Sequence, residues 1–446
     1  MGRSGKRSVA SQEAIYDART LGTPRMMVLG IQHMFAMFGA TVLVPQLTGL
    51  SVSSTLLFAG LGTLLFHFIS KGMVPAFLGS SFAFLAGYGA IAPNGERELL
   101  PYACFGVAAA SVLYFVLAAL IKAFGVKRVM KFFPPVVTGP IIIAIGLTLS
   151  QSAVDNCSAN WFVALTAIII VVVCNIWGKG MIRVIPIILG ALGSYIVAVL
   201  MGGVDFTGIK EAAWLGLPVH MEDTVFEIFK APDTSLLITA VITIMPIAIA
   251  TMMEHIGDIA AISSTVGRNF FEEPGLHRTL VGDGLATLVA SIFGAPANTT
   301  YGENTGVLTL SRVYDPRVIR IAACIAIVFS FSPKFAAVIG SMPAATCGGI
   351  SIVLYGMISA VGVRNVVENQ VDFKESRNVI IAALILVLSI GVKYSAAGAI
   401  NINVGDITIG LSGLAVGALV GIILNAVLPD FSSEDVVEGK EPKPLK

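Results

Sequence analysis

Charged residues are scarce in this sequence of 446 residues. Asp, Glu, Lys and Arg make up 12% of it, about half of their share in an ordinary soluble domain. Hydrophobic residues make up 56%, and the mean hydropathy is +0.87. This composition excludes a soluble globular domain and indicates an integral membrane protein. The net charge of +1 gives no reason to expect a nucleic acid or an acidic polymer as partner.

Cysteine motifs and a signal peptide are also lacking. The five cysteines are scattered without CxxC spacing, at Cys104, Cys157, Cys174, Cys324 and Cys347. Four of them lie in or beside apolar runs, where cysteine acts as a small buried hydrophobic residue. We therefore expect neither a disulfide framework nor a cysteine metal site. The first 25 or so residues are polar and basic, and contain no hydrophobic region followed by a cleavage site.

What the chain does contain is a series of apolar runs separated by charged residues, Pro or Gly. A membrane-spanning helix needs about 20 apolar residues, and by this measure there are roughly fourteen spans. They begin near Met26, Ser53, Val74, Tyr102, Pro135, Trp161, Ile185, Ser235, Leu276, Thr299, Pro316, Phe335, Val379 and Gly405. The third and tenth are short and rich in Gly, Ser and Thr. The sequence thus predicts an all-α polytopic membrane protein, with short extended pieces in those two spans.

The basic residues are distributed unevenly along this layout. With the N-terminus in the cytoplasm, nearly all of the 28 Lys and Arg fall in cytoplasmic loops or tails. The exceptions are Arg97, Lys210, Lys230, Lys334 and Lys393. The positive-inside rule therefore predicts that both termini are cytoplasmic.

The two halves of the chain resemble each other. Residues 80–84 in the third span are similar to 299–303 in the tenth, and 135–138 in the fifth are similar to 343–346 in the twelfth. This matched order predicts two repeats of about seven spans. Because seven is odd, the second repeat must be inverted relative to the first. Inverted repeats with interrupted segments are typical of secondary transporters with a site near the bilayer midplane.

Two glutamates interrupt the apolar pattern. Glu254 follows the apolar run 236–253, and Glu303 lies in a polar, Gly-rich stretch between two apolar segments. An ionisable side chain at membrane depth costs at least about 2.5–3.5 kcal/mol, and such residues usually mark substrate or proton pathways. The alternative is a surface loop with ordinary solvated carboxylates.

The interrupted segments suit a small polar ligand. If 78–84 and 298–303 are extended and each precedes a half-helix, free N–H groups and positive dipole ends point into a cavity. Those donors fit ligand carbonyl oxygens, while Glu254 and Glu303 fit ligand N–H groups. A nucleobase edge offers both. Phe82 is a candidate stacking face for a flat ring, with lipid or core packing as the alternative.

Glu254 and Asp258 are four residues apart and would share one face of a helix. Two carboxylates that close in a low dielectric should not both be ionised, which makes the pair a candidate proton carrier. A water-exposed helix end, with both ionised, is the alternative. His255 points off that face and is either a packing residue or a proton relay. These three residues lack the HExxH spacing, so we expect no metal site.

Several motifs together resemble one family. The segments 32–45, 78–84, 274–278, 298–304 and 348–356 are similar to those of the nucleobase–ascorbate transporter family, in particular to its bacterial uracil carriers. The similarity runs from about 22 to 428.

The resemblance implies fourteen spans in two domains. A core domain would comprise 25–132 and 234–333, and a gate domain 133–233 and 334–429, between cytoplasmic tails at 1–24 and 430–446. It implies proton-coupled nucleobase uptake in the cytoplasmic membrane without a cofactor, the proton being the coupling ion, although Na⁺ stays open. A homodimer in the lipid bilayer is expected on the same ground. No nucleophile–base pair indicates an enzyme, and the buried acids disfavour an anion carrier.

The resemblance also implies site residues. The base would lie against Phe82, with Glu254 and Glu303 accepting its N–H groups and the backbone around Gly302 contacting a carbonyl. Supporting residues would be Ala40, Tyr301, Tyr355 and His33, of which the last is expected to pack or join a network rather than bind ligand. Glu303 is the residue of uracil carriers, where many xanthine and urate carriers have Gln. Asp258 is the type found in the purine branch, so xanthine or urate stays open as the substrate.

Overall fold

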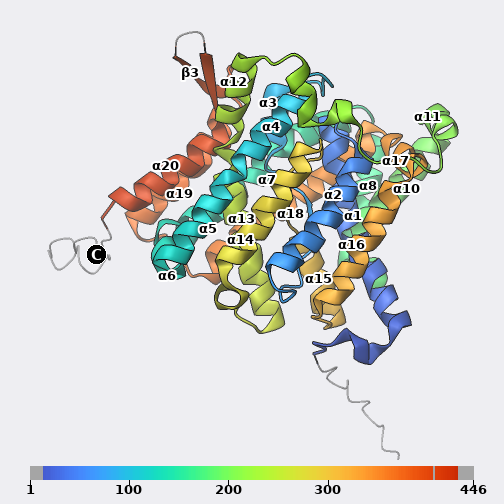
Figure 1. Ribbon diagram of the computed structural model, residues 1–446, viewed down its shortest axis with the longest axis horizontal. Coiled ribbons are helices and arrows are strands. Elements are labelled where there is room, and N and C mark those ends of the chain that lie inside the picture. The colour runs from blue at the N-terminus through green and yellow to red at the C-terminus, as the bar shows by residue number, and fades with distance from the viewer. Residues whose placement is uncertain (1–13, 405–406, 430–446) are drawn as a thin grey trace, which may run out of the picture.

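The structure is a computed structural model that describes residues 14–404 and 407–429 (Figure 1). Helices dominate it. The first half contains η1 (Ala18–Leu21), α1 (Thr23–Thr48), α2 (Val52–Ile69), β1 (Leu78–Ser80), α3 (Leu85–Ile91), α4 (Leu100–Ala110), α5 (Val112–Phe124), α6 (Val126–Val129), η2 (Met130–Phe132), α7 (Pro135–Ser158), α8 (Trp161–Trp177), α9 (Met181–Val184), α10 (Pro186–Leu200), α11 (Thr207–Glu211), η3 (Met221–Asp223) and η4 (Val225–Lys230).

The second half follows with α12 (Thr234–Ile244), α13 (Ile247–Val266), η5 (Phe271–Gly275), α14 (Leu276–Ile292), β2 (Asn298–Thr300), α15 (Gly302–Ser311), α16 (Pro316–Ser330), α17 (Pro333–Gly340), α18 (Ala344–Glu368), α19 (Ser376–Lys393), β3 (Ala399–Val404), β4 (Ile407–Ser412) and α20 (Gly413–Val427). Within the described residues, 7 helical segments are long and apolar enough to cross a membrane, or 8 if the bent pair α16–α17 counts as one. Shorter apolar helices are α8, α10 and α20. The protein is therefore a multi-pass membrane protein.

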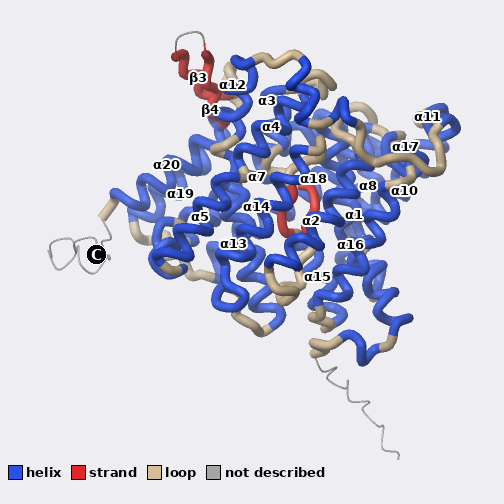
Figure 2. Tube along the Cα trace, in the orientation of Figure 1, coloured by secondary structure: helices blue, strands red, loops and turns tan. Residues whose placement is uncertain are grey.

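Two short strands lie in the middle of the bundle (Figure 2). β1 and β2 pair antiparallel, with Leu78 opposite Thr300 and Ser80 opposite Asn298. The pairing extends beyond the strands, since Tyr301 N donates to Phe77 O at 2.9 Å and Ser81 N to Ala297 O at 2.8 Å. Non-helical backbone at membrane depth needs such internal partners because lipid offers none. Each strand leads into a short helix, α3 or α15.

Long helices from the two halves pack closely around these strands. α7 and α18 meet where glycines remove side chains from the contact: a β-carbon on Gly362 would lie 2.7 Å from Gly139 O, and one on Gly146 would clash with Tyr355 O. Small residues allow this approach of backbones, which in lipid supplies much of the packing energy between helices.

The twelfth and fourteenth apolar runs differ from the expected layout. Phe335, expected near the start of a span, lies in α17, which is bent by 90° from α16. The helix α17 ends at Gly340, and the long helix α18 begins only at Ala344, with Pro343 as its N-cap. Near residue 405, outside the described residues, the expected span start is flanked instead by the hairpin strands β3 and β4, which project at one end beside α12 (Figure 2). The apolar helix α20 starts at Gly413.

Candidate functional site

A cavity of about 600 Å³ lies where α13, α18 and the two interrupted segments meet. Phe82, Glu254, Asp258, Tyr301 and Gly302 all border it. These residues come from positions far apart in the sequence, and the paired strands β1 and β2 bring them together. Five of the predicted site residues thus share one cavity.

Two acids face this cavity from α13. Glu254 and Asp258 lie one helical turn apart, and Asp258 is only 8% exposed. Thr300, at the end of β2, donates a hydrogen bond from Oγ1 to Asp258 Oδ2 at 3.2 Å. A β-carbon on Gly302 would lie 3.3 Å from Asp258 Oδ1. The first turn of α15 therefore approaches the acid pair closely, and glycine permits the approach.

Phe82 follows β1 and precedes α3. Its side chain is 5% exposed and borders the cavity. The Tyr355 ring of α18 packs against it edge-on, with ring centroids 5.7 Å apart and planes inclined by 76°. Tyr355 itself is not among the described residues that line the cavity. Its contact fixes the orientation of the Phe82 ring, as edge-to-face aromatic pairs do.

His255 points away from the cavity into the bundle. It is fully buried, with Nδ1 3.3 Å from Thr300 Oγ1 and 3.4 Å from Asp283 Oδ2. The Phe66 ring stands edge-on to it at 6.3 Å. Thr300 therefore contacts both His255 and Asp258, and joins the interior of the bundle to the cavity wall.

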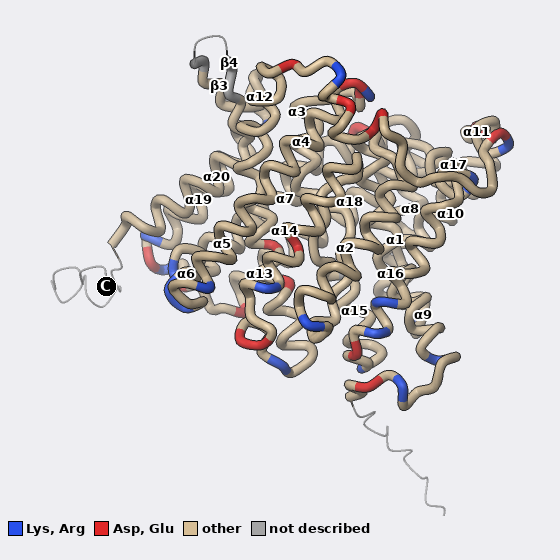
Figure 3. Tube along the Cα trace, viewed as in Figure 1, with Lys and Arg blue, Asp and Glu red and all other residues tan. Residues whose placement is uncertain are grey.

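Asp283 was not anticipated as a site residue. It is fully buried in α14, next to His255. The signal was present in the sequence, because a single acid inside the apolar run 279–292 is as costly at membrane depth as Glu254. Acidic residues are visible inside the bundle near α13 and α14 (Figure 3).

Three supporting candidates remain: Tyr301 borders the cavity, whereas His33 and Ala40 lie behind its wall. Tyr301 OH donates to Ser80 O at 2.9 Å, which fastens β2 to β1. His33 Nδ1 lies 3.1 Å from Asn304 Nδ2, so His33 takes part in a network between α1 and α15. Ala40 is buried in α1 and, like His33, is not among the described lining residues.

Glu303 is the second residue of α15. Its backbone is helical, and its side chain lies outside the described part of the structure. Its predicted contact with a ligand therefore remains a prediction. Among the described residues, no group of three or more His, Cys, Asp or Glu is placed to hold a metal ion.

One end of the cavity reaches the ends of three helices. Ser264 of α13, Thr309 of α15 and the α18 residues Arg364 and Glu368 line it there. Lys and Arg gather along the edge of the bundle where α13 and α15 end (Figure 3). The cavity is therefore polar towards the basic end of the molecule.

Comparison with solved structures gives the same architecture. The murine anion transporter Slc26a9 in an inward-facing state aligns with a TM-score of 0.62 at 13% identity, over 95% of this chain and 73% of that chain. The transmembrane domain of the cyanobacterial bicarbonate transporter BicA aligns with a TM-score of 0.57 at 14% identity, over 93% and 99%. At such identities the likeness concerns the fold alone.

Sequence relatives are much nearer. The uracil permease of Bacillus caldolyticus is 41% identical over 426 residues, covering 93% of this chain and 94% of the relative. That of Bacillus subtilis (strain 168) is 38% identical over 430 residues, covering 93% and 95%. The uracil permease of Escherichia coli (strain K12) is 36% identical over 410 residues, covering 90% of each.

A bundle of apolar helices with a polar cavity at two interrupted segments is typical of membrane transport proteins, and the permease relatives point to the same class. Residues 24–398 match the model of the Permease family. The chain belongs to this family, the nucleobase–ascorbate transporters.

Proposed function

We propose that this protein imports uracil together with protons by alternating access. The observation that carries the proposal is the meeting of an aromatic ring, Phe82, an acid pair, Glu254 and Asp258, and a glycine-led helix start, Gly302, around one cavity. The ring would stack on a flat base, the acids would accept its N–H groups, and the start of α15 would donate N–H groups to a carbonyl. The names of the relatives, uracil permeases, support uracil as that base.

The proposal includes about fourteen spanning segments in two inverted seven-span repeats. The antiparallel pairing of β1 with β2 and the matched prolines that precede or begin α7 and α18 support it. Core segments 25–132 and 234–333 would carry the base past a gate formed by 133–233 and 334–429. The gathering of Lys and Arg at one end supports cytoplasmic termini. We expect a homodimer in the membrane and no cofactor.

To couple uptake to the proton gradient, we propose that the acidic residues beside the cavity bind a proton. Glu254 and Asp258 are the first candidates, with His255 as a relay towards Asp283. Thr300 lies between Asp258 and His255, with its Oγ1 3.2 Å from Asp258 Oδ2 and 3.3 Å from His255 Nδ1. Water entering from the polar end of the cavity would then take the proton.

Asp258 also favours a second candidate function, the uptake of xanthine or urate. An acid at this position is the type found in the purine branch, whereas Glu303 is the uracil type. Uptake of labelled uracil and labelled xanthine into cells without their own carriers decides between them. Uracil uptake that xanthine does not compete for supports the first proposal, and the reverse supports the second.

A further inference from the structure

A short N-terminal segment crosses the end of the bundle where α13 and α15 finish. We call residues 15–18 the N-terminal strap. Ile15 N donates to Arg312 O at 2.9 Å, and Tyr314 N donates to Ile15 O at 2.8 Å, which gives a parallel bridge between Ile15 and Val313. The strap is thus hydrogen-bonded to the turn between α15 and α16, some 300 residues away in the chain.

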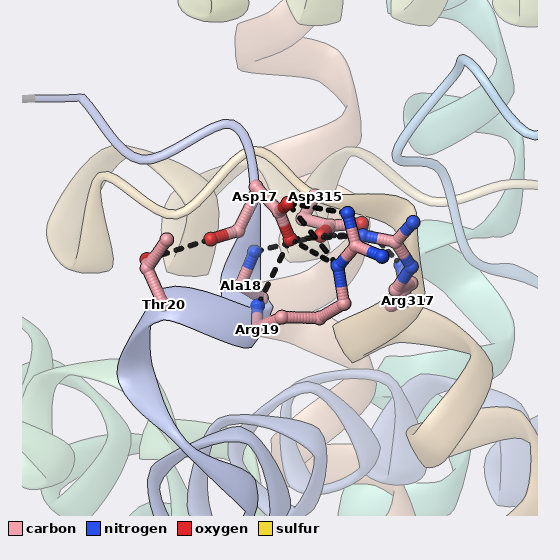
Figure 4. A network of polar contacts seen from close by, with 6 residues as sticks. All are labelled: Asp17, Ala18, Arg19, Thr20, Asp315 and Arg317. Carbon is pink, nitrogen blue, oxygen red and sulfur yellow. Dashed lines mark hydrogen bonds and ion pairs between the residues drawn. The ribbon is translucent and has the colours of Figure 1, made fainter.

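A buried carboxylate holds the next part of the strap (Figure 4). Asp315 is only 4% exposed, and its Oδ2 accepts hydrogen bonds from Ala18 N at 2.7 Å and from Arg317 Nη1 at 3.0 Å. The Arg317 guanidinium also contacts Asp17 Oδ1 at 3.0 Å. Hydrogen bonds from Arg19 lower the pKa of Asp17 to about 2, so Asp17 stays ionised at neutral pH.

Tyr16 connects the strap to α13. Its OH donates to Val266 O, at the last residue of α13, at 2.8 Å. The Arg268 guanidinium lies 4.6 Å from the Tyr16 ring centroid, and the Tyr314 ring lies 5.6 Å away. The same residue therefore contacts the end of α13 and the turn that follows α15.

α15 needs such support for two reasons. It has 10 residues, and helices of that length are marginal without tertiary contacts. Its C-cap, Arg312, also has the left-handed conformation, φ 52°, which a non-glycine residue adopts at a cost. The β1–β2 pairing holds Thr300 and Tyr301, just before the helix, and the strap bonds to the carbonyl of Arg312, just after it.

We infer that the strap is a positioning element for the substrate site: it ties the ends of α13 and α15 together, so that Glu254 and Asp258 keep their place relative to the first turn of α15. Asp315 and Tyr16 are positioning residues that act through the two helices, without contact with the cavity. The inference rests on the proposed uracil site for its functional consequence and on the contacts above for its structural one.

Ala18→Pro tests it by removing one backbone donor. Proline lacks the N–H that Asp315 accepts, and it is tolerated at the first position of a helix such as η1. Asp17, which precedes it, is already extended at φ −126° and ψ 101°, as a residue before proline prefers. Arg19→Ala is the control, because the Arg19 side chain is exposed and, among the described residues, hydrogen-bonds only to Asp17, two residues away in the same segment. Tyr16→Phe is a second variant, which keeps the ring and loses the bond to Val266.

Two quantities are measured on the purified full-length protein: amide hydrogen exchange without ligand and the Kd for uracil. Ala18→Pro and Tyr16→Phe should speed exchange in 262–266 and 308–314 and weaken uracil binding about three- to tenfold, while Arg19→Ala changes neither.

Unchanged exchange in Ala18→Pro and Tyr16→Phe would refute the tie between the helices. Faster exchange with an unchanged Kd would refute its role at the site. Should Ala18→Pro fail to fold, Tyr16→Phe alone decides by the same two readouts. If the parent does not bind uracil but the exchange result holds, the proposed substrate fails and the tie between the helices stands.

Discussion

The hydroxyl of Thr300 donates to the carboxylate of Asp258 at 3.2 Å, and this bond joins the end of a strand in one interrupted segment to the acid pair on α13. Thr300→Val removes the donor and keeps the shape, leaving a buried polar group short of a partner at a cost of about 1–3 kcal/mol. We expect uracil uptake, as kcat/KM, to fall by about five- to 100-fold.

Thr300→Ser is the control for that change, because it keeps the hydroxyl. Its uptake should stay near the parent value. Equal uptake by the Val and Ser variants would show that the hydroxyl has no part in transport.

Phe82 is expected to stack on the base. Phe82→Ala should weaken the binding of every accepted base by about 1–3 kcal/mol, the range measured for base–aromatic stacking elsewhere. Phe82→Tyr keeps the aromatic face and should change the Kd little. Direct binding to the purified variants measures both, and a negligible effect of the alanine change would contradict the assignment.

Glu303 is expected to select uracil. Its ionised carboxylate can only accept hydrogen bonds and so matches two adjacent N–H donors, whereas Glu303→Gln places a donor against a donor. The Kd for uracil should rise roughly 10- to 100-fold, corresponding to about 1–3 kcal/mol. A variant that binds uracil as tightly as the parent would show that Glu303 does not recognise the base in this way.

Asp258 is expected to carry the coupling proton. Asp258→Asn holds a neutral side chain at that place, so uracil binding and exchange across the membrane should persist while accumulation against a gradient is lost. Parallel measurements of exchange and net uptake separate the two. If the variant still concentrates uracil with the parent's pH dependence, Glu254 or His255 becomes the better candidate.

Several residues that line the cavity could be predicted from the sequence, because polar residues are unusual inside apolar runs. Glu254 and Asp258 interrupt an apolar run at helical spacing, and the structure places both on the cavity wall. Residues 78–80 and 298–300 are short strands within the two stretches rich in Gly, Ser and Thr. Asp283 gives the same signal as Glu254, a lone acid inside an apolar run.

Other features depend on contacts between segments far apart in the chain, which no local sequence pattern predicts. The strap pairs Ile15 with Val313 through backbone atoms, which leave no trace in side-chain periodicity. Phe335 lies in an apolar run that continues into α18, yet α17 ends at Gly340 and α18 begins at Ala344, after Pro343, so that run forms two helices. His255 could not be assigned from the sequence, because only the packing of α14 against α13 brings Asp283 beside it.

Uracil accumulation in proteoliposomes under an imposed pH gradient tests the central claim most directly. The purified protein is reconstituted with a neutral interior, and labelled uracil is added outside at neutral or acidic pH, with and without a protonophore. We expect uracil to accumulate above the external concentration only when the outside is acidic, and the protonophore to abolish the accumulation. Uracil that merely equilibrates, or accumulates equally without the gradient, would contradict proton-coupled uracil uptake.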